Sequence, residues 1–282
     1  MSHNIGIIGY GIVGEGVEHA LAPAADAVRI YDKYKEHDTL EETVRNSTFL
    51  FVCVPTPCDF EAQTIDLSIM DEVMEALAAL TDGDQIVIIK STVVPGTTDT
   101  YAQQYEDLNL AMVPEFLREK THLEDAKNPS RVVVGANCEE VARRIKSLYR
   151  RAFPEVPIFL LQTAEAELVK YMSNCFLAAK VILANVFSEY AEAIGGNYDE
   201  LKEALTTDPR IIDDHLEVTE ERGFGGKCFP KDLNALIGFA RSQGLDADLL
   251  DAIWRKNMEV RKTLDWKRIP GASSADMEWP ER

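Results

Sequence analysis

The chain has 282 residues, of which 46% are hydrophobic and 27% are charged, a composition typical of a soluble globular protein with one large or two modest domains. Its formal net charge of −19 argues against sequence-independent binding to nucleic acid or to an anionic membrane surface, because both need basic patches. No apolar run approaches the roughly 18 residues of a membrane span, and no basic segment precedes the short apolar stretch at the N-terminus, so we expect a cytoplasmic protein.

The first half of the chain alternates short β-branched runs with amphipathic segments. Near-continuous apolar strands separated by helices are typical of a parallel sheet covered on both faces. The pattern predicts an α/β fold, with a Rossmann-type doubly wound parallel sheet in one domain over residues 1–160. The helices expected there include Leu67–Leu80 and Glu139–Arg151. The expected strands are Asn4–Ile8, Val28–Tyr31, Phe49–Val54, Gln85–Ile89, Asn109–Val113 and Arg131–Val134.

A different pattern begins at Thr163. From there to Ala193 the chain has no glycine or proline, and apolar residues recur every three or four positions. This predicts one helix of about 30 residues that ends at Gly195 and Gly196, long enough to span two domains or to pack against a partner subunit. With further helices expected at Asp199–Thr207, Asp232–Gln243 and Ala247–Lys262, we predict a smaller all-helical domain over 161–262 and a loose tail over 263–282.

A glycine-rich turn follows the first strand. The sequence GYGIVG has the GxGxxG spacing, and Asp32 ends the second strand 18 residues after Gly14. The glycines allow a tight turn, a close approach of a pyrophosphate and close packing of helix on strand, while the carboxylate accepts hydrogen bonds from an adenine ribose and repels a 2′-phosphate. The sequence therefore predicts an NAD site; the alternative is an ordinary strand-to-helix turn. The predicted cofactor residues are Gly9, Gly11, Ile12, Val13, Gly14, Asp32, Lys33, Val54, Thr56 and Thr92.

Hydroxyl and carboxylate side chains follow later strands. Thr56 lies in VPTP and Thr92 in KSTVVPGT, both at carboxyl ends of strands, where ligands bind in open α/β sheets; turn capping is the alternative. The fifth strand leads into VPEFLRE. If this stretch is helical, Glu115 and Glu119 lie on one helix face and could act as a general base and proton relay, although such a pair is more often a solvated face.

The long helix carries a second polar pair. Lys170 and Asn174, four residues apart, interrupt a largely apolar pattern. They could donate hydrogen bonds to a developing oxyanion; the alternative is a lysine that reaches the surface and an asparagine on the polar face.

One thiol lies in GFGGKCFPKD. The chain has five cysteines with no CxxC pair, so we expect neither disulfides nor a metal site. Lys227 and Lys231 flank Cys228 and favour its thiolate. Cys53, Cys138 and Cys175 lie in strand or helix patterns and are expected to pack, and Cys58 is undecided. With a nicotinamide site, Cys228 predicts aldehyde oxidation through a thiohemiacetal and a thioester.

Taken in order, these motifs resemble the UDP-glucose/GDP-mannose dehydrogenases, which use two NAD to oxidise the C6 alcohol of a nucleotide sugar to a carboxylate. The resemblance covers residues 4 to about 262, and GFGGKCFPKD is its most specific marker. The other markers are GYGIVG, VPTP, KSTVVPGT, PEFLRE, the AELVKYMSN helix and DPRI.

The resemblance implies catalytic roles. Cys228 would be the nucleophile, while Lys170 and Asn174 would steady the oxyanion and position a water. Asp232 and Thr92 would handle protons with that water. Either Glu115 or Glu119 would be the base in thioester hydrolysis.

It also implies roles in binding. Arg210 in DPRI would reach the active site of the partner subunit, Lys231 would lie near the cofactor pyrophosphate, and the long helix would hold a homodimer together. The implied substrate contacts are Phe116, Leu117, Lys170, Asn174, Arg210, Phe224 and Gly225.

Family members usually continue into a third domain that binds the nucleotide, and this sequence stops shortly after WRKNMEVRKT. We therefore expect a short form whose nucleotide half-site is missing or supplied by another chain. The expected activity is oxidation of UDP-glucose to UDP-glucuronate by a homodimer. The alternatives are the same chemistry on a UDP-N-acetyl-hexosamine or GDP-mannose, and an inactive NAD-binding remnant or partner subunit.

Overall fold

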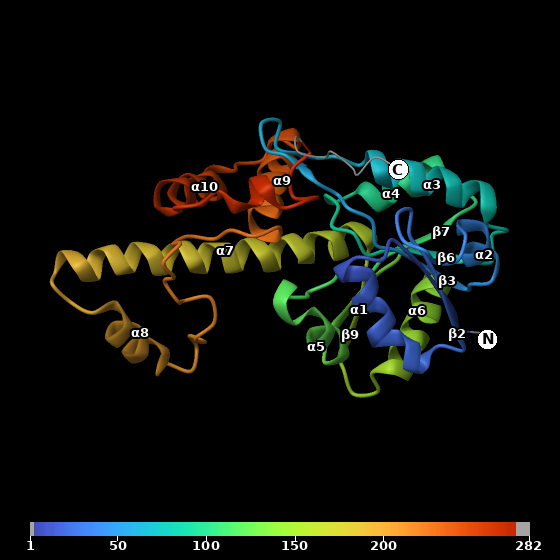
Figure 1. Ribbon diagram of the computed structural model, residues 1–282, viewed down its shortest axis with the longest axis horizontal. Coiled ribbons are helices and arrows are strands. Elements are labelled where there is room, and N and C mark those ends of the chain that lie inside the picture. The colour runs from blue at the N-terminus through green and yellow to red at the C-terminus, as the bar shows by residue number, and fades with distance from the viewer. Residues whose placement is uncertain (1–2, 275–282) are drawn as a thin grey trace. The chain divides into compact units, whose positions relative to one another are not determined.

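The computed structural model describes residues 3–274. Its main sheet has seven strands in the order β2-β1-β3-β6-β7-β8-β9 (Figure 1). The strands are β1 (Asn4–Ile8), β2 (Ala27–Tyr31), β3 (Phe49–Val52), β6 (Ile86–Ile89), β7 (Asn109–Met112), β8 (Val132–Gly135) and β9 (Ile158–Leu161). This confirms the predicted doubly wound α/β fold, in which β1 lies between β2 and β3 and the middle strand of the sheet is β6.

Helices and 3-10 turns connect the strands. Neighbouring residues of β3 contribute to different cores: Phe49 and Phe51 pack in one, and Leu50 and Val52 in the other. This alternation is that of a strand whose two faces are both buried. The connecting elements are α1 (Ile12–Leu21), η1 (Ala22–Ala24), α2 (Leu40–Arg45), α3 (Ser68–Leu80), α4 (Thr97–Gln104), η2 (Glu119–Thr121), α5 (His122–Lys127) and α6 (Glu139–Ala152).

The sheet departs from the prediction in two places. Strand β9 was not expected, because its short apolar run IFLL lies between a proline-containing turn and the long helix and lacks alternation. In addition, β8 pairs with β7 in the antiparallel direction, at Met112 and Gly135, whereas the other pairs in the sheet are parallel. The sheet is therefore mixed at this point.

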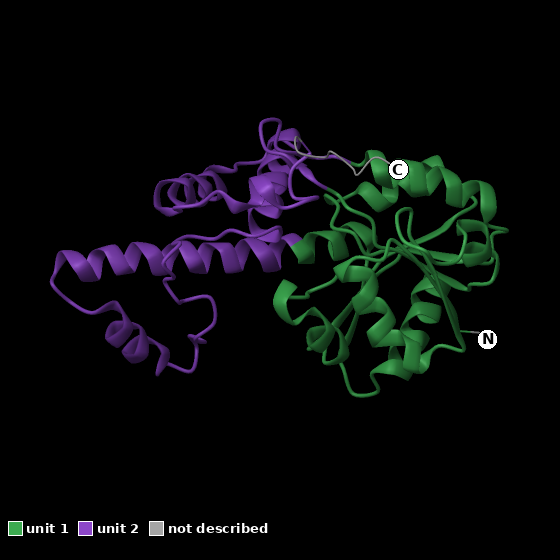
Figure 2. Cartoon of the chain, viewed as in Figure 1, with its two compact units in different colours: residues 1–56, 67–170 green, residues 57–66, 171–282 purple. Residues whose placement is uncertain are grey.

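The long helix α7 (Thr163–Ala193) has the predicted bounds. By length and composition it could cross a membrane, with a mean hydropathy of 1.2 in its most apolar window and half of that window buried. Core helices of soluble proteins have the same properties, so this is weak evidence for a span. Within α7 the chain divides into two compact units: the first runs to Thr56 and then over Leu67–Lys170, and the second holds Pro57–Asp66 and the residues from Tyr171 onward (Figure 2).

The second unit is largely helical, as predicted for the C-terminal part of the chain. The second half of α7, α9 and α10 share a core that includes Cys175, Leu233 and Ile253. The unit also contains a short β-hairpin, so it departs from the prediction of an all-helical domain. In the sequence, this hairpin lies between two strands of the first unit, β3 and β6. The unit's elements are β4 (Cys58–Asp59), β5 (Thr64–Ile65), α8 (Tyr198–Thr206), α9 (Cys228–Ser242), α10 (Asp248–Val260) and η3 (Asp265–Arg268).

The segment after α10 is packed up to Ser274, whereas the sequence predicted a loose tail. Trp266 is almost completely buried, and its ring packs at a tilt against those of Trp254 and Phe60. Cys58 of the hairpin forms a parallel bridge with Ser273. The contacts of Phe60 with Trp266 and of Cys58 with Ser273 join residues more than 200 positions apart, and a local polarity pattern cannot predict such contacts. The remainder of the predicted tail lies outside the described residues.

Candidate active site

The glycine turn has the geometry that the sequence predicts. Gly9 has a φ of +91°, which a side chain would strain. A Cβ added to Gly14 would lie 2.2 Å from the Gly9 carbonyl oxygen, so a larger residue would force α1 away from β1. At Gly11, the residue before α1, an added Cβ would meet no atom within 4 Å. The backbone at the start of α1 is therefore open to an anionic group, as dinucleotide binding requires.

Asp32 ends β2 beside this turn. Its carboxylate accepts hydrogen bonds from the backbone N–H groups of Tyr10, at 2.8 Å, and Tyr34, at 2.9 Å. Lys33 forms an ion pair with Glu72. Asp32 is thereby fixed at the place where an adenine ribose binds in this type of turn. These residues fit an NAD molecule.

Thr56 and Thr92 join the two loops that follow β3 and β6. The Thr56 hydroxyl donates to the Thr92 carbonyl at 2.8 Å, so it holds the loops together. The Thr92 side chain is half-buried. Val54 and Val13 pack in the cores on either side of the sheet, while Ile12 is exposed.

We expect Asp32→Asn to weaken NAD binding about tenfold, because the ribose diol loses a charged acceptor. Binding of NADP should be weakened less, or improve, because the carboxylate that repels the 2′-phosphate is gone. Titration calorimetry with both nucleotides measures the ratio. Asp38→Asn is a matched control, since the Asp38 carboxylate likewise accepts a hydrogen bond from a backbone N–H, that of Ile30. An unchanged NAD-to-NADP ratio in Asp32→Asn would contradict the assignment.

Glu115 forms a buried ion pair with Lys170. The Lys170 Nζ lies 2.8 Å from the carboxylate, and the two side chains are 4% and 11% exposed. Burial opposes ionisation, yet the Lys170 ammonium and the hydrogen bond from the Leu117 N–H keep the pKa of Glu115 below its ordinary value of 4.5. The carboxylate is therefore ionised at neutral pH. The ionised carboxylate stabilises the folded protein fully at pH values above its ordinary pKa of 4.5. This stabilisation is lost as the pH falls through the lowered pKa of the folded state.

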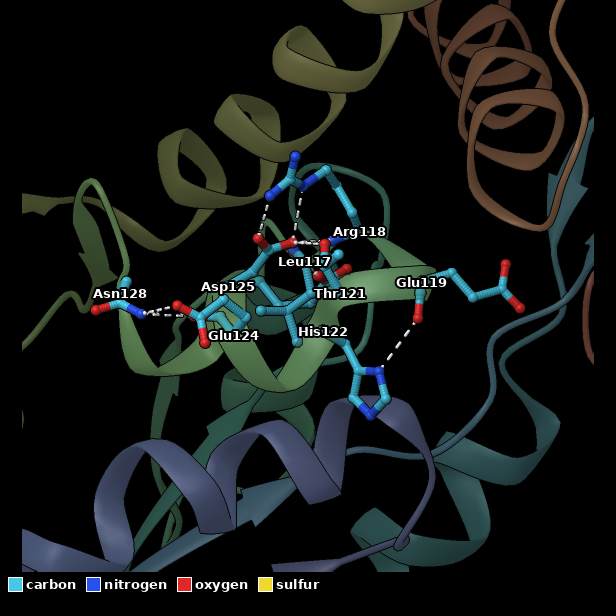
Figure 3. Close-up of polar contacts among 9 residues, drawn as sticks. Leu117, Arg118, Glu119, Thr121, His122, Glu124, Asp125 and Asn128 are labelled. Atoms are coloured by element: carbon cyan, nitrogen blue, oxygen red, sulfur yellow. Dashed lines mark hydrogen bonds and ion pairs between the residues drawn. The ribbon is translucent and has the colours of Figure 1, made fainter.

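The segment that carries Glu115 is not a helix, so the expectation that Glu115 and Glu119 share a helix face is wrong. Pro114 lies just before Glu115, and the chain stays irregular until η2 begins at Glu119. Glu119 is exposed, and its carboxylate points away from the polar contacts of the segment (Figure 3). The structure thus separates two carboxylates that the sequence could not distinguish.

Arg118 and Asp125 fix the shape of this segment (Figure 3). Asp125 accepts hydrogen bonds from the backbone N–H and the guanidinium of Arg118 and from the Thr121 hydroxyl. The Arg118 hydrogen bonds lower the pKa of Asp125 to about 2. Within the same segment, the Phe116 ring stacks under the Arg131 guanidinium at 3.9 Å, and Leu117 packs near Gly16 of α1.

Lys90 is a second buried lysine near Glu115, and sequence analysis did not assign it. It follows β6, and its Nζ lies 3.4 Å from the Pro114 carbonyl oxygen. Burial lowers the pKa of Lys90 to about 8. The signal was present in the sequence, because a lysine directly continues the apolar run QIVII. The Glu115 carboxylate therefore interacts electrostatically with two lysines, Lys170 and Lys90.

In the second unit, Cys228 is the first residue of α9, not a loop residue as the glycine run suggested. Asp232, one turn later, is buried and accepts a hydrogen bond from the Asn174 amide at 2.5 Å. The Lys231 ammonium is also buried and donates to the other Asp232 oxygen at 2.6 Å. The structure thus brings together Asn174, Lys231 and Asp232, three of the predicted site residues.

The other thiols differ from Cys228 in exposure. Burial raises the pKa of Cys53, Cys58 and Cys175 to about 12 in each case, so these thiols stay protonated and pack. Cys138 was expected to pack as well, but it is exposed, because it lies just before α6 and outside the buried face of that helix. Cys228 is half-buried.

The predicted substrate residues of the second unit differ in burial. Phe224 is buried against Phe229 and Trp254, so its ring is part of the core and does not offer a contact surface for a ligand. Gly225 is half-buried. Arg210 is exposed and pairs with Asp208 two residues earlier.

Comparisons with known proteins identify both parts of the chain. Residues 15–153 match the NAD-binding domain of the UDP-glucose/GDP-mannose dehydrogenase family, and residues 164–259 match its central domain. The chain is 32% identical over 231 residues to UDP-glucose 6-dehydrogenase of Rickettsia prowazekii, a match that covers 80% of this chain and 52% of the relative. It therefore spans about half the length of the curated relatives that it matches.

Solved structures give the same result. A UDP-glucose dehydrogenase from the hyperthermophilic archaeon Pyrobaculum islandicum superposes with a TM-score of 0.83 at 29% identity, over 92% of this chain and 68% of that one. A UDP-D-ManNAc dehydrogenase from Pyrococcus horikoshii has a TM-score of 0.78 at 26% identity, over 91% and 68% of the two chains. The first unit carries an NAD-binding domain, and NAD is its cofactor. The chain belongs to the UDP-glucose/GDP-mannose dehydrogenase family.

Proposed function

We propose that the protein oxidises the C6 alcohol of a nucleotide sugar, UDP-glucose, to the carboxylate with NAD. One observation carries the proposal: Cys228 begins α9 one turn before the buried Asp232, which is hydrogen-bonded to Asn174. A half-buried thiol at a helix N-terminus, next to a fixed carboxylate and amide, is suited to covalent catalysis on a carbonyl carbon.

The proposed chemistry has two oxidations. Bound NAD supplies the hydride acceptor for each. After the first oxidation, the Cys228 sulfur bonds to the aldehyde carbon, and after the second it holds the sugar as a thioester. Water then breaks the carbon–sulfur bond, which releases the carboxylic acid and returns the thiol. The chain must therefore stabilise an oxyanion twice and accept a proton from water once.

The predicted site residues would supply these needs in the proposal. The Asn174 amide and the Lys170 ammonium are hydrogen-bond donors on α7, four residues apart, and would stabilise the oxyanion. Glu115 is ionised and would accept the proton of the attacking water, in preference to the exposed Glu119. Thr92 and Asp232 would help to place that water, and Lys231 would contact the cofactor.

A panel of nucleotide sugars tests the proposal. Purified protein is given NAD with UDP-glucose, UDP-N-acetyl-mannosamine or GDP-mannose, and NADH is followed at 340 nm. We expect two NADH per UDP-glucose consumed. The similarity to a UDP-D-ManNAc dehydrogenase makes the acetylated sugar the second candidate. NAD binding without NADH formation from any sugar would support the inactive partner-subunit alternative instead.

We further propose a homodimer formed through α7. From Met172 onward, large apolar side chains of α7 are exposed along one stripe at spacings of three, four and seven residues: Met172, Phe176, Leu183, Phe187 and Tyr190. The following helix α8 has no buried residue and exposes Leu201 and Leu205. Contiguous apolar surface of this kind usually marks a protein interface. In such a dimer, Arg210 would reach the partner's active site.

We expect Phe176→Glu to convert the dimer to a monomer, because Phe176 is 69% exposed within this stripe and a buried charge there would be unpaired. Size-exclusion chromatography with light scattering measures the mass. Phe159→Glu is the control, since Phe159 is an exposed aromatic of β9 in the first unit. A wild-type monomer, or a dimer that survives Phe176→Glu, would contradict the proposed interface.

The location proposed for the protein is the cytoplasm. None of its five cysteines, all in the described part of the chain, forms a disulfide. Reduced thiols are the rule in that compartment.

A further inference from the structure

The glycine run before Cys228 is shaped by side chains from distant parts of the second unit. Five backbone groups in Arg222–Gly226 are hydrogen-bonded to side chains that lie far away in the sequence. The donors and acceptors come from α7, from α10 and from the segment after α10: Asn185, Asn257, Arg261 and Asp265. A run this rich in glycine has little conformational preference of its own, so its path into α9 depends on these bonds.

Asn257 fixes the first part of the run. It is completely buried, and its side-chain oxygen accepts from the Phe224 N–H at 2.7 Å while its amide donates to the Phe224 carbonyl at 3.1 Å. A Cβ added to Gly223 would lie 2.3 Å from the same side-chain oxygen. This contact anchors the run to the core, so any variant of Asn257 would also affect folding.

Arg261 and Asp265 fix the part nearest to Cys228. The Arg261 guanidinium donates to the Arg222 carbonyl at 3.0 Å and pairs with Asp265 at 3.0 Å. The other Asp265 oxygen accepts from the Gly226 N–H at 2.9 Å. The two side chains thus bracket the glycines, with Arg261 at the start of the run and Asp265 at its end.

Gly225 lies directly against this ion pair. A Cβ there would be 2.3 Å from both the Arg261 nitrogen and the Asp265 oxygen, which shows how closely the pair covers the backbone. Gly226 has a φ of +74° and is two residues before Cys228. A change at the Gly226 amide therefore changes the direction from which the chain enters α9, where the thiol is the first side chain.

We propose that Arg261 and Asp265 are positioning residues for Cys228: their ion pair holds the glycine backbone, and through it the thiol, in the geometry for attack on the substrate carbonyl. The inference rests on the proposed role of Cys228 as the nucleophile. Positioning matters here because a reacting atom misplaced by about 1 Å can cost about 100-fold in rate.

The test compares Asp265→Ala with Asp251→Ala in the full chain. Asp251 is a matched control: it also pairs with one arginine, Arg241, its side chain is 31% exposed against 35% for Asp265, and its pair does not contact the glycine run. Each variant is first checked for folding by circular dichroism and for its Tm.

Two readouts do not depend on turnover. Hydrogen exchange of the Gly226 amide, followed by NMR, should become about fivefold faster in Asp265→Ala, as expected for loss of one hydrogen bond. Alkylation of Cys228 by iodoacetamide should accelerate to a similar degree relative to the exposed Cys138, measured by peptide mass spectrometry. Asp251→Ala should behave as wild type in both. Wild-type exchange and alkylation in Asp265→Ala would overturn the proposal.

The third readout is kinetic. With UDP-glucose, Asp265→Ala should lower kcat about 10- to 100-fold and leave the KM for NAD unchanged, because the predicted NAD residues of the glycine turn belong to the other unit. An equal loss in Asp251→Ala would show an effect on the whole unit and would overturn the proposal. If wild-type protein turns over no sugar nucleotide, the proposed function fails, but exchange and alkylation still decide whether the pair holds the thiol.

A second variant covers the case in which Asp265→Ala does not fold. Asp265→Asn keeps an oxygen that can accept from the Gly226 N–H and removes the charge that pairs with Arg261. We expect it to restore part of the wild-type exchange protection and part of kcat. If Asp265→Asn equals wild type in all three readouts, the ion pair has no positioning role and the proposal is overturned.

Discussion

Replacing Cys228 by alanine is expected to lower acid formation from UDP-glucose by about 10⁴-fold or more, because no other group can form the thioester. The variant should still bind NAD, since the glycine turn and Asp32 belong to the first unit. Cys228→Ser should be similarly slow in net acid formation, because a serine hydroxyl is far less acidic than a thiol. The measurement is NADH formation at 340 nm with quantification of the sugar acid.

The chain offers its own control for this substitution. Cys138→Ala removes the other thiol that reagents can reach, since Cys138 is exposed, and should leave the rate at the wild-type value. Peptide mass spectrometry should find the sugar adduct on Cys228 in protein quenched during turnover. An active Cys228→Ala protein would refute covalent catalysis at this position.

Replacing Glu115 by glutamine is expected to slow turnover about 10²- to 10⁴-fold, the range typical of a general base. The thioester should then accumulate on Cys228, because its formation does not need Glu115 and its hydrolysis does. Rapid mixing should therefore show a burst of NADH followed by a slow phase, and intact mass spectrometry should show the adduct. Glu119→Gln is the matched control from the same segment, with an exposed carboxylate, and should be within about twofold of wild type.

The same substitution should destabilise the protein. Lys170 loses the anionic partner of a buried ion pair, and breaking such a pair from one side costs about 3–5 kcal/mol of unfolding free energy. Urea unfolding of Glu115→Gln and Glu119→Gln measures the difference. If Glu115→Gln turns over slowly but shows neither burst nor adduct, Glu115 acts before the thioester and is not the hydrolytic base.

Several elements could be predicted because their signal is local. The bounds of α7 could be predicted because apolar residues recur every three to four positions between Thr163 and Ala193. Gly195 and Gly196, which end the helix, lie just after this stretch. The glycine turn is equally local: Gly9 and Gly14 each have a steric reason that the spacing encodes, and Gly11 leaves the backbone at the start of α1 open. By contrast, β9 and the β4–β5 hairpin are stabilised by strands and helices elsewhere, and their short runs carry no period of their own.

The sequence by itself determined the fold class, the long helix, the dinucleotide turn and the family. It also predicted candidate catalytic side chains, but not their partners. Only the tertiary structure paired Lys170 with Glu115, 55 residues away, and Asn174 with Asp232, 58 residues away. It alone distinguished Glu115 from Glu119, and it bound Asp265 to Gly226 across 39 residues. The physical reason is that propensity and periodicity act between near neighbours, whereas burial and charge pairing are decided when distant segments pack.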